Sequence, residues 1–217
     1  MKISTKRVET LSDSIIAIII TIMIIELKIP DLNDSNRKYE MIIMVNNLIP
    51  YFITYAFSFM MIGILWTNHH HMFHLLERTD AGLLWHNFLF LFLTSLIPFA
   101  TSIVGSNPFL ALSAAIYGSV MLLTSFSFLI MRDYSIRKKL LHKDSNREIT
   151  RRIVRISFRG RTKTIIAVAL YLISIPLAFV SVYLSYACML VPPVIFFIPE
   201  AIDMDDEKVN VEIEQVQ

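Results

Sequence analysis

Histidines gather at one place in the chain, directly after an apolar run that ends at Trp66. His70 and His74 are one helical turn apart, so both could face a metal ion. Membrane metal enzymes use several separate groups of histidines. Here only His86 and His142 lie outside this group, and they do not form a second one. We therefore expect no catalytic metal, no cofactor and no enzyme activity, and we expect one histidine to pack inward while the others face water or headgroups.

Three further polar side chains stand in or beside apolar segments, where such groups are costly and therefore informative. Ser12 and Asp13 open one apolar stretch, and Asn87 lies early in another. If the ends of these helices meet, Ser12, Asp13, His70 and Asn87 could satisfy one another's hydrogen bonds. The alternative for Asp13 is a carboxylate at a helix start, where the positive end of the helix dipole stabilises it.

The elements that must position these side chains are membrane helices. Of the 217 residues, 55% are hydrophobic and 18% charged, against about 25% charged in soluble domains. The charges gather between long uncharged stretches, each near the length of about 20 residues that a span requires. The sequence predicts an all-α membrane protein with one domain, residues 1–202, and six transmembrane helices at residues 8–29, 48–67, 83–104, 109–131, 164–183 and 186–199. The last two follow from an uncharged stretch, residues 164–199, that is too long for one span and is expected to turn near residues 183–186.

Basic residues are concentrated in the connection at residues 132–163, where only Asp133, Asp144 and Glu148 oppose them. Because cytoplasmic loops carry an excess of lysine and arginine, this connection is expected in the cytoplasm. Six spans then place both termini there, in a multi-pass protein of the cell membrane, with residues 203–217 as an acidic tail. Such basic segments lie against anionic lipid headgroups, and the scarcity of aromatic residues among them argues against nucleic-acid binding.

Three ordered motifs resemble the transmembrane protein 175 family, which comprises endolysosomal potassium channels and their prokaryotic homologues. Residues 7–13 (RVETLSD) resemble the RxxxFSD signature of its first helix, with leucine in place of phenylalanine. Trp66 followed by His69 and His70 resembles its second-helix pattern. Asn87 with residues 96–101 (LIPFAT) resembles its third. The resemblance covers residues 7–101, whereas the later helices match only in hydropathy and in the basic connection.

The resemblance implies a potassium-permeable cation channel built as a homotetramer, with the first helix of each subunit lining a central pore. It further implies a constriction of bulky apolar side chains in place of a filter loop, and a modest preference for potassium over sodium. Mapped onto this chain, the expected pore-lining residues are Ile20, Thr21, Ile24 and Leu27. The expected interhelical network that holds the first helix comprises Arg7, Ser12, Asp13, Trp66, His70 and Asn87.

The physics is compatible with such a pore, because an apolar constriction makes ions shed water and potassium holds its water less tightly than sodium. Isoleucine dominates the whole first helix, so its periodicity does not indicate which face lines a pore. The alternative function is a secondary transporter or proton-coupled exchanger that uses Asp13 and the second-helix histidines as a relay. Such transporters have inverted repeats and broken helices, and here only Pro98 is expected to kink a helix.

Overall fold

The computed structural model describes residues 4–26, 37–142 and 147–197, and nearly all of these residues are helical. In chain order, the elements are α1 (Thr5–Ile22), the 3-10 turn η1 (Met23–Glu26), α2 (Arg37–His74), α3 (Ala81–Thr94), α4 (Ile97–Ser106), α5 (Ala111–Arg137), α6 (Arg147–Val180) and α7 (Val182–Phe197). The all-helical fold class predicted from the sequence is therefore confirmed for the part of the chain that the structure covers.

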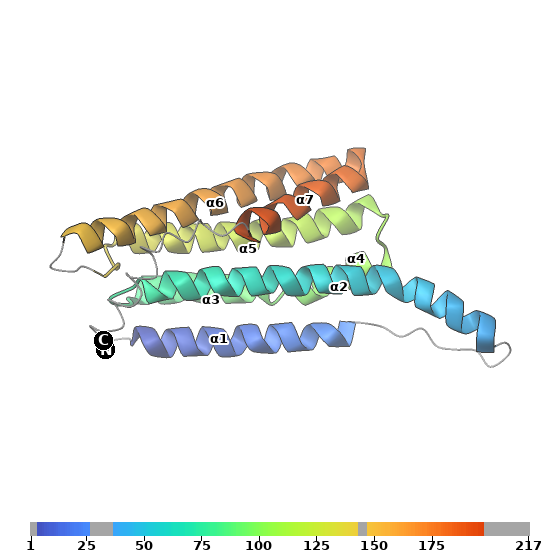
Figure 1. Ribbon diagram of the computed structural model, residues 1–217, viewed down its shortest axis with the longest axis horizontal. Coiled ribbons are helices and arrows are strands. Elements are labelled where there is room, and N and C mark those ends of the chain that lie inside the picture. The colour runs from blue at the N-terminus through green and yellow to red at the C-terminus, as the bar shows by residue number, and fades with distance from the viewer. Residues whose placement is uncertain (1–3, 27–36, 143–146, 198–217) are drawn as a thin grey trace.

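The helices run along the long axis of the molecule, and their connections gather at its two ends (Figure 1). The start of α1, the α2–α3 loop and the start of α6 lie at one end, which we call the proximal end. There the α2–α3 loop pairs with the segment after α5, since Glu77 N donates to Leu140 O at 2.9 Å and His142 N donates to Leu75 O at 2.9 Å. The two connections are thus tied together by backbone hydrogen bonds.

The third predicted span is broken into α3 and α4, with Ser95 and Leu96 between them. Pro98 stands in the first turn of α4, where a missing N–H costs nothing because that group has no intrahelical acceptor. Within a continuous helix the same residue would remove a backbone hydrogen bond and clash with the preceding turn. The prediction that Pro98 disturbs this helix is confirmed.

Within the described residues, five helical segments are long and apolar enough to cross a membrane: Thr5–Ile25, Leu48–His74, Ala81–Ser106, Ala111–Arg137 and Ile153–Val180. α7 is apolar but has 16 residues, which at ~1.5 Å per residue is shorter than the ~30 Å hydrocarbon core. The count of six spans therefore stays a prediction.

Two boundaries differ from those expected. The chain turns back at Ser181, between α6 and α7, rather than at residues 183–186, because an uncharged stretch carries no mark of where it folds. The basic connection expected at residues 132–163 is mostly helical, since α5 continues to Arg137 and α6 begins at Arg147. Charged residues can extend a helix beyond the apolar span because their polar ends reach water. The acidic tail at residues 203–217 lies outside the described residues.

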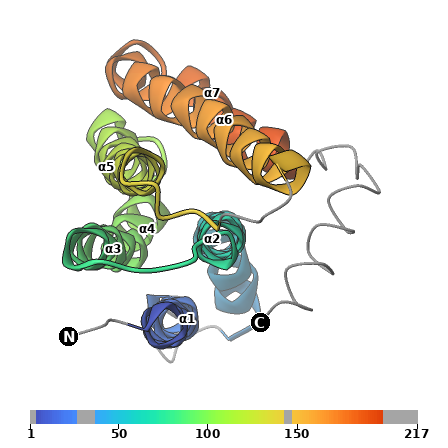
Figure 2. The ribbon, with the colours of Figure 1, turned by 90° about the vertical axis from the view of Figure 1, so that its left-hand side faces the viewer.

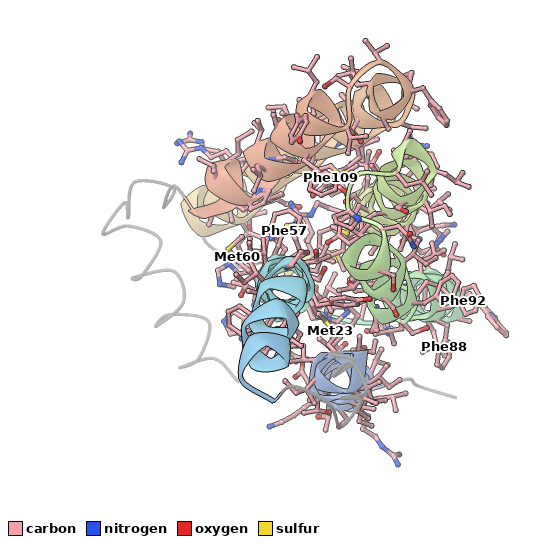
Figure 3. The ribbon with its side chains drawn as sticks, turned by 90° about the vertical axis from the view of Figure 1, so that its right-hand side faces the viewer. Met23, Phe57, Met60, Phe88, Phe92 and Phe109 are labelled. Atoms are coloured by element: carbon pink, nitrogen blue, oxygen red, sulfur yellow. The ribbon has the colours of Figure 1, made fainter. Side chains whose placement is uncertain are left out.

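α5 packs against α3, α4, α6 and α7 and lies between the α3–α4 pair and the α6–α7 pair, while α1 lies at the edge of the bundle (Figure 2). Gly118 permits this close packing, because a Cβ there would come within 2.8 Å of Met189 and 2.9 Å of Ser174. On the outside, Phe88 and Phe92 of α3 point away from the bundle, whereas Met23 points inward (Figure 3) and is fully buried. The edge position of α1 leaves one of its faces uncovered by the rest of the chain.

Candidate functional site

α1 has one face against the bundle and one face open to the outside of the single chain (Figure 2). Its buried residues are Val8, Ser12, Ile16 and Ile19. The opposite side carries Ser14, Ile18 and Thr21, and Ile25 of η1 continues this row, since the four residues are spaced three or four apart. We call this row the outer stripe. Ile18 is 55% exposed and Ile25 is 73% exposed, which is unusual for so apolar a helix unless lipid or another subunit covers it.

The four residues expected to line a pore fall in different environments. Thr21 and Ile24 are exposed, with Thr21 at the centre of the open face and Ile24 beside it. Ile20 is partly buried and packs against the core of the bundle. Leu27 lies outside the described residues. Sequence reasoning did not single out Ile18 and Ile25, which are also exposed, because isoleucines occupy both faces of this segment and give no sign of which side packs.

A fully buried chain of hydrogen bonds joins three helices at the proximal end. Asn87 of α3 donates through Nδ2 to Ser12 Oγ of α1 at 2.8 Å, and its Oδ1 lies 2.8 Å from His69 Nε2 of α2. All three residues have no exposed surface. The His69 ring also stacks on Phe73, with centroids 4.4 Å apart, and on Phe90 at 5.5 Å. We call Ser12, Asn87 and His69 the buried chain.

The donors and acceptors of the buried chain can be assigned without ambiguity. The Ser12 hydroxyl donates to Val8 O at 2.9 Å, so Ser12 Oγ is the acceptor for Asn87. The Asn87 carbonyl oxygen must then accept from His69, which carries its proton on Nε2. Since His69 Nδ1 is buried and has no hydrogen-bond partner, a second proton there would have no acceptor. A neutral His69 therefore completes the chain.

A second cluster lies on the side of α1 that faces α2, and it is only partly buried. Trp66 Nε1 donates to Asp13 Oδ1 at 2.9 Å. The Trp66 indole stacks on the His70 ring with centroids 5.7 Å apart, and His70 Nδ1 lies 3.1 Å from Glu9 Oε1. We call Glu9, Asp13, Trp66 and His70 the open cluster.

The structure thus divides the expected interhelical network in two. Ser12 meets Asn87, and Asp13 meets Trp66, on different sides of α1. His70 belongs with Asp13, while its neighbour His69 bridges to Asn87. Three adjacent histidines give no sequence signal for which ring turns inward, because packing sets the rotation of the helix. Among the described residues, no partner of the exposed Arg7 side chain is found.

The third motif, residues 96–101, holds α4 to its neighbours farther from the proximal end. Thr101 Oγ1 donates to Ser58 Oγ of α2 at 2.8 Å, and Ser58 Oγ lies 2.9 Å from the Tyr117 hydroxyl of α5. All three are buried. The hydrogen bonds of the three motifs therefore join α1 to α2 and α3, and α4 to α2.

Comparisons with known proteins agree with this arrangement. Residues 7–98 match the family described as the endosomal/lysosomal potassium channel TMEM175. A protein named as a potassium channel from a Chryseobacterium strain is 37% identical over 131 residues, which cover 60% of this chain and 65% of that protein. The bovine endosomal/lysosomal proton channel TMEM175 is 34% identical over 89 residues, which cover 38% of this chain and 19% of that protein.

A solved structure matches the chain over most of its length. It is the crystal structure of a lysosomal potassium-selective channel TMEM175 homolog from Chamaesiphon minutus, with a TM-score of 0.70 and 26% sequence identity. The match covers 88% of this chain and 95% of that one. The similarity therefore extends beyond the three motifs to the arrangement of the later helices.

Proposed function

Because this chain belongs to the family of the endosomal/lysosomal potassium channel TMEM175, we propose that it forms a potassium-permeable pore as a homotetramer in the cell membrane. The observation that carries the proposal is the outer stripe, a row of isoleucine and hydroxyl side chains that the bundle leaves uncovered. One chain supplies one α1, which cannot enclose a path alone. Several copies of α1 arranged around an axis can do so, and the family resemblance gives the number four.

The proposed lining is Ile18, Thr21 and Ile25, with Ile24 at the edge of the row. Rings of isoleucine would form an apolar constriction that makes a passing ion give up water, which costs potassium less than sodium. Thr21 Oγ1 donates to Ile18 O at 2.9 Å, so its oxygen lone pairs remain available to an ion. A pore without rings of carbonyls to replace the hydration shell should prefer potassium only modestly.

The buried chain and the open cluster would hold α1 in the orientation that presents this row. Ser12 ties α1 to α3 through Asn87, and Asp13 ties it to α2 through Trp66. Ser12 lies on the packed face of α1 and Asp13 lies beside it, so the two attachments hold α1 from different directions and together resist its rotation. We further propose that the proximal end faces the cytoplasm, because the basic connection belongs to it.

The test is recording from the purified protein in planar bilayers, with potassium on one side and sodium on the other. We expect stepwise currents that reverse toward the potassium equilibrium potential. A pH gradient in a second recording measures proton permeation, which the name of the bovine relative makes a necessary control. Absence of current together with coupled uptake into proteoliposomes would overturn the channel and favour the transporter.

The lining is tested by Ile18→Asn and Ile25→Asn. A polar ring hydrates the constriction, so potassium conductance should rise several-fold and the preference over sodium should fall. The matched control is Ile173→Asn on α6, which changes the same residue type at 50% exposure without touching α1. Equal currents in all three variants and the unmodified protein would show that the outer stripe does not line the path.

A further inference from the structure

The open cluster contains three side chains that could share one metal ion. The ligand atoms of Glu9, Asp13 and His70 all lie within 4.8 Å of one another, and no other group of three of this kind occurs in the described part of the chain. We propose that these residues bind a divalent transition-metal cation of the zinc type, which clamps α1 to α2 at the proximal end. This inference does not depend on the proposed pore.

The spacing of the ligand atoms suits such an ion. Glu9 and Asp13 are four residues apart on α1, so they are neighbours on one face, and His70 of α2 lies opposite. Atoms bound to one tetrahedral zinc at 2.0–2.2 Å are about 3.3–3.6 Å apart. His70 Nδ1 and Glu9 Oε1 are 3.1 Å apart, and a side-chain rotation would bring the partly exposed Asp13 carboxylate to the same distance.

The pair of His70 and Glu9 also leaves bonding capacity unused. His70 Nδ1 is shielded from solvent yet makes no aligned hydrogen bond, although a carboxylate oxygen is close to it. A ring nitrogen that faces a carboxylate without an aligned hydrogen bond can direct its lone pair at a cation between them. Three protein ligands and one water would complete a four-coordinate site.

The charge of the cluster favours a dication of a particular chemistry. Two carboxylates face one imidazole, and within the described residues neither Glu9 nor Asp13 is paired with a lysine or arginine. Magnesium and calcium select sites made of oxygen, whereas an imidazole ligand suits zinc, copper and nickel. His70 therefore shifts the preference of the cluster toward the transition metals.

Trp66 positions two of the three ligands. Its indole N–H holds Asp13 Oδ1, and its ring lies against the ring of His70. Neighbours that orient metal ligands in this way are worth about 10–100-fold in metal affinity. The same side chain can thus support both the attachment of α1 to α2 and the site between them.

The experiment uses the full-length protein, purified in detergent with an affinity tag free of histidine and stripped of metal with a chelator. Equilibrium dialysis against zinc chloride should give one zinc per chain at micromolar concentration, and saturation should raise the thermal midpoint. Magnesium chloride at the same concentration should do neither. Because ion flux is not measured, the result is independent of whether the protein conducts.

Variants assign the bound metal to these residues. Glu9→Gln and His70→Gln should each weaken zinc binding at least about tenfold, and Trp66→Phe should weaken it by a similar factor while keeping an aromatic ring beside His70. His142→Gln, which changes a histidine outside the cluster, should bind as the unmodified protein does. Either absence of saturable binding up to millimolar zinc, or undiminished binding in Glu9→Gln, would overturn the proposal.

Discussion

The two clusters that hold α1 use adjacent residues, Ser12 and Asp13, in opposite ways. The buried chain is sealed from solvent, and each of its three side chains is hydrogen-bonded to another of them. The open cluster carries more formal charge but keeps contact with solvent through His70 and Trp66. Because water competes for exposed groups and leaves buried ones no alternative, we expect the buried chain to hold α1 more strongly than the open cluster does, although it carries less charge.

The largest effect should come from Asn87→Ala, which leaves both Ser12 Oγ and His69 Nε2 without their partner. Each orphaned buried group costs about 1–3 kcal/mol, and Ser12 Oγ keeps its bond to Val8 O, so the free energy of unfolding should fall by about 2–4 kcal/mol. Denaturant or thermal unfolding in detergent measures it. The matched control is Asn68→Ala, because the side-chain hydrogen bond that Asn68 makes within the described residues is to Ile64 O of its own helix. Equal losses in the two variants would contradict the buried chain.

Ser12→Ala should have a smaller effect, since it removes one hydroxyl and orphans only the Asn87 amide. We expect a loss of about 1–2 kcal/mol in the same unfolding measurement. Ser14→Ala, two residues along α1, is the control, because in the described part of the chain its exposed hydroxyl donates to Thr10 O of the same helix. A loss as large in Ser14→Ala as in Ser12→Ala would mean that the burial of Ser12 contributes nothing.

The smallest effect should come from Trp66→Phe in the absence of added metal. It removes the hydrogen bond to Asp13 but leaves the carboxylate accessible to water, so the loss should stay below about 1 kcal/mol. Trp85→Phe on α3, where the side chain is 73% exposed, corrects for the smaller ring. If Trp66→Phe destabilises the protein as much as Asn87→Ala does, the two clusters are not different in kind.

Much of the fold could be predicted from the sequence, because the lengths of the apolar segments and the positions of the charged residues indicate where the membrane helices lie. The five long apolar helices, the break at Pro98 and the family all follow from patterns visible in the printed residues. The turn at Ser181 could not be placed from the sequence, since the uncharged stretch has no charged residue there to mark the end of a membrane helix. The sequence also could not show that α6 begins at Arg147. A basic segment outside the membrane has the same composition whether it forms a loop or a helix.

The candidate site was predictable in its members but not in its geometry. Ser12, Asp13, Trp66 and Asn87 stand out because polar groups in apolar helices need partners. Which of them meet depends on the rotation of α1 and α2 about their own axes. Packing fixes that rotation to a fraction of a turn, and it turned His69 rather than His70 toward Asn87.

By itself, the sequence determined that this chain is a bundle of membrane helices with a few costly polar residues near their proximal ends. Hydrophobic length and the expense of burying polar groups are properties of the residues alone. Only the tertiary structure decided which side of α1 is packed, and so separated Ile20 from Ile18 and Ile25. The physical reason is that a helix of isoleucines is nearly uniform around its circumference, and the neighbours that select one face come from distant parts of the chain.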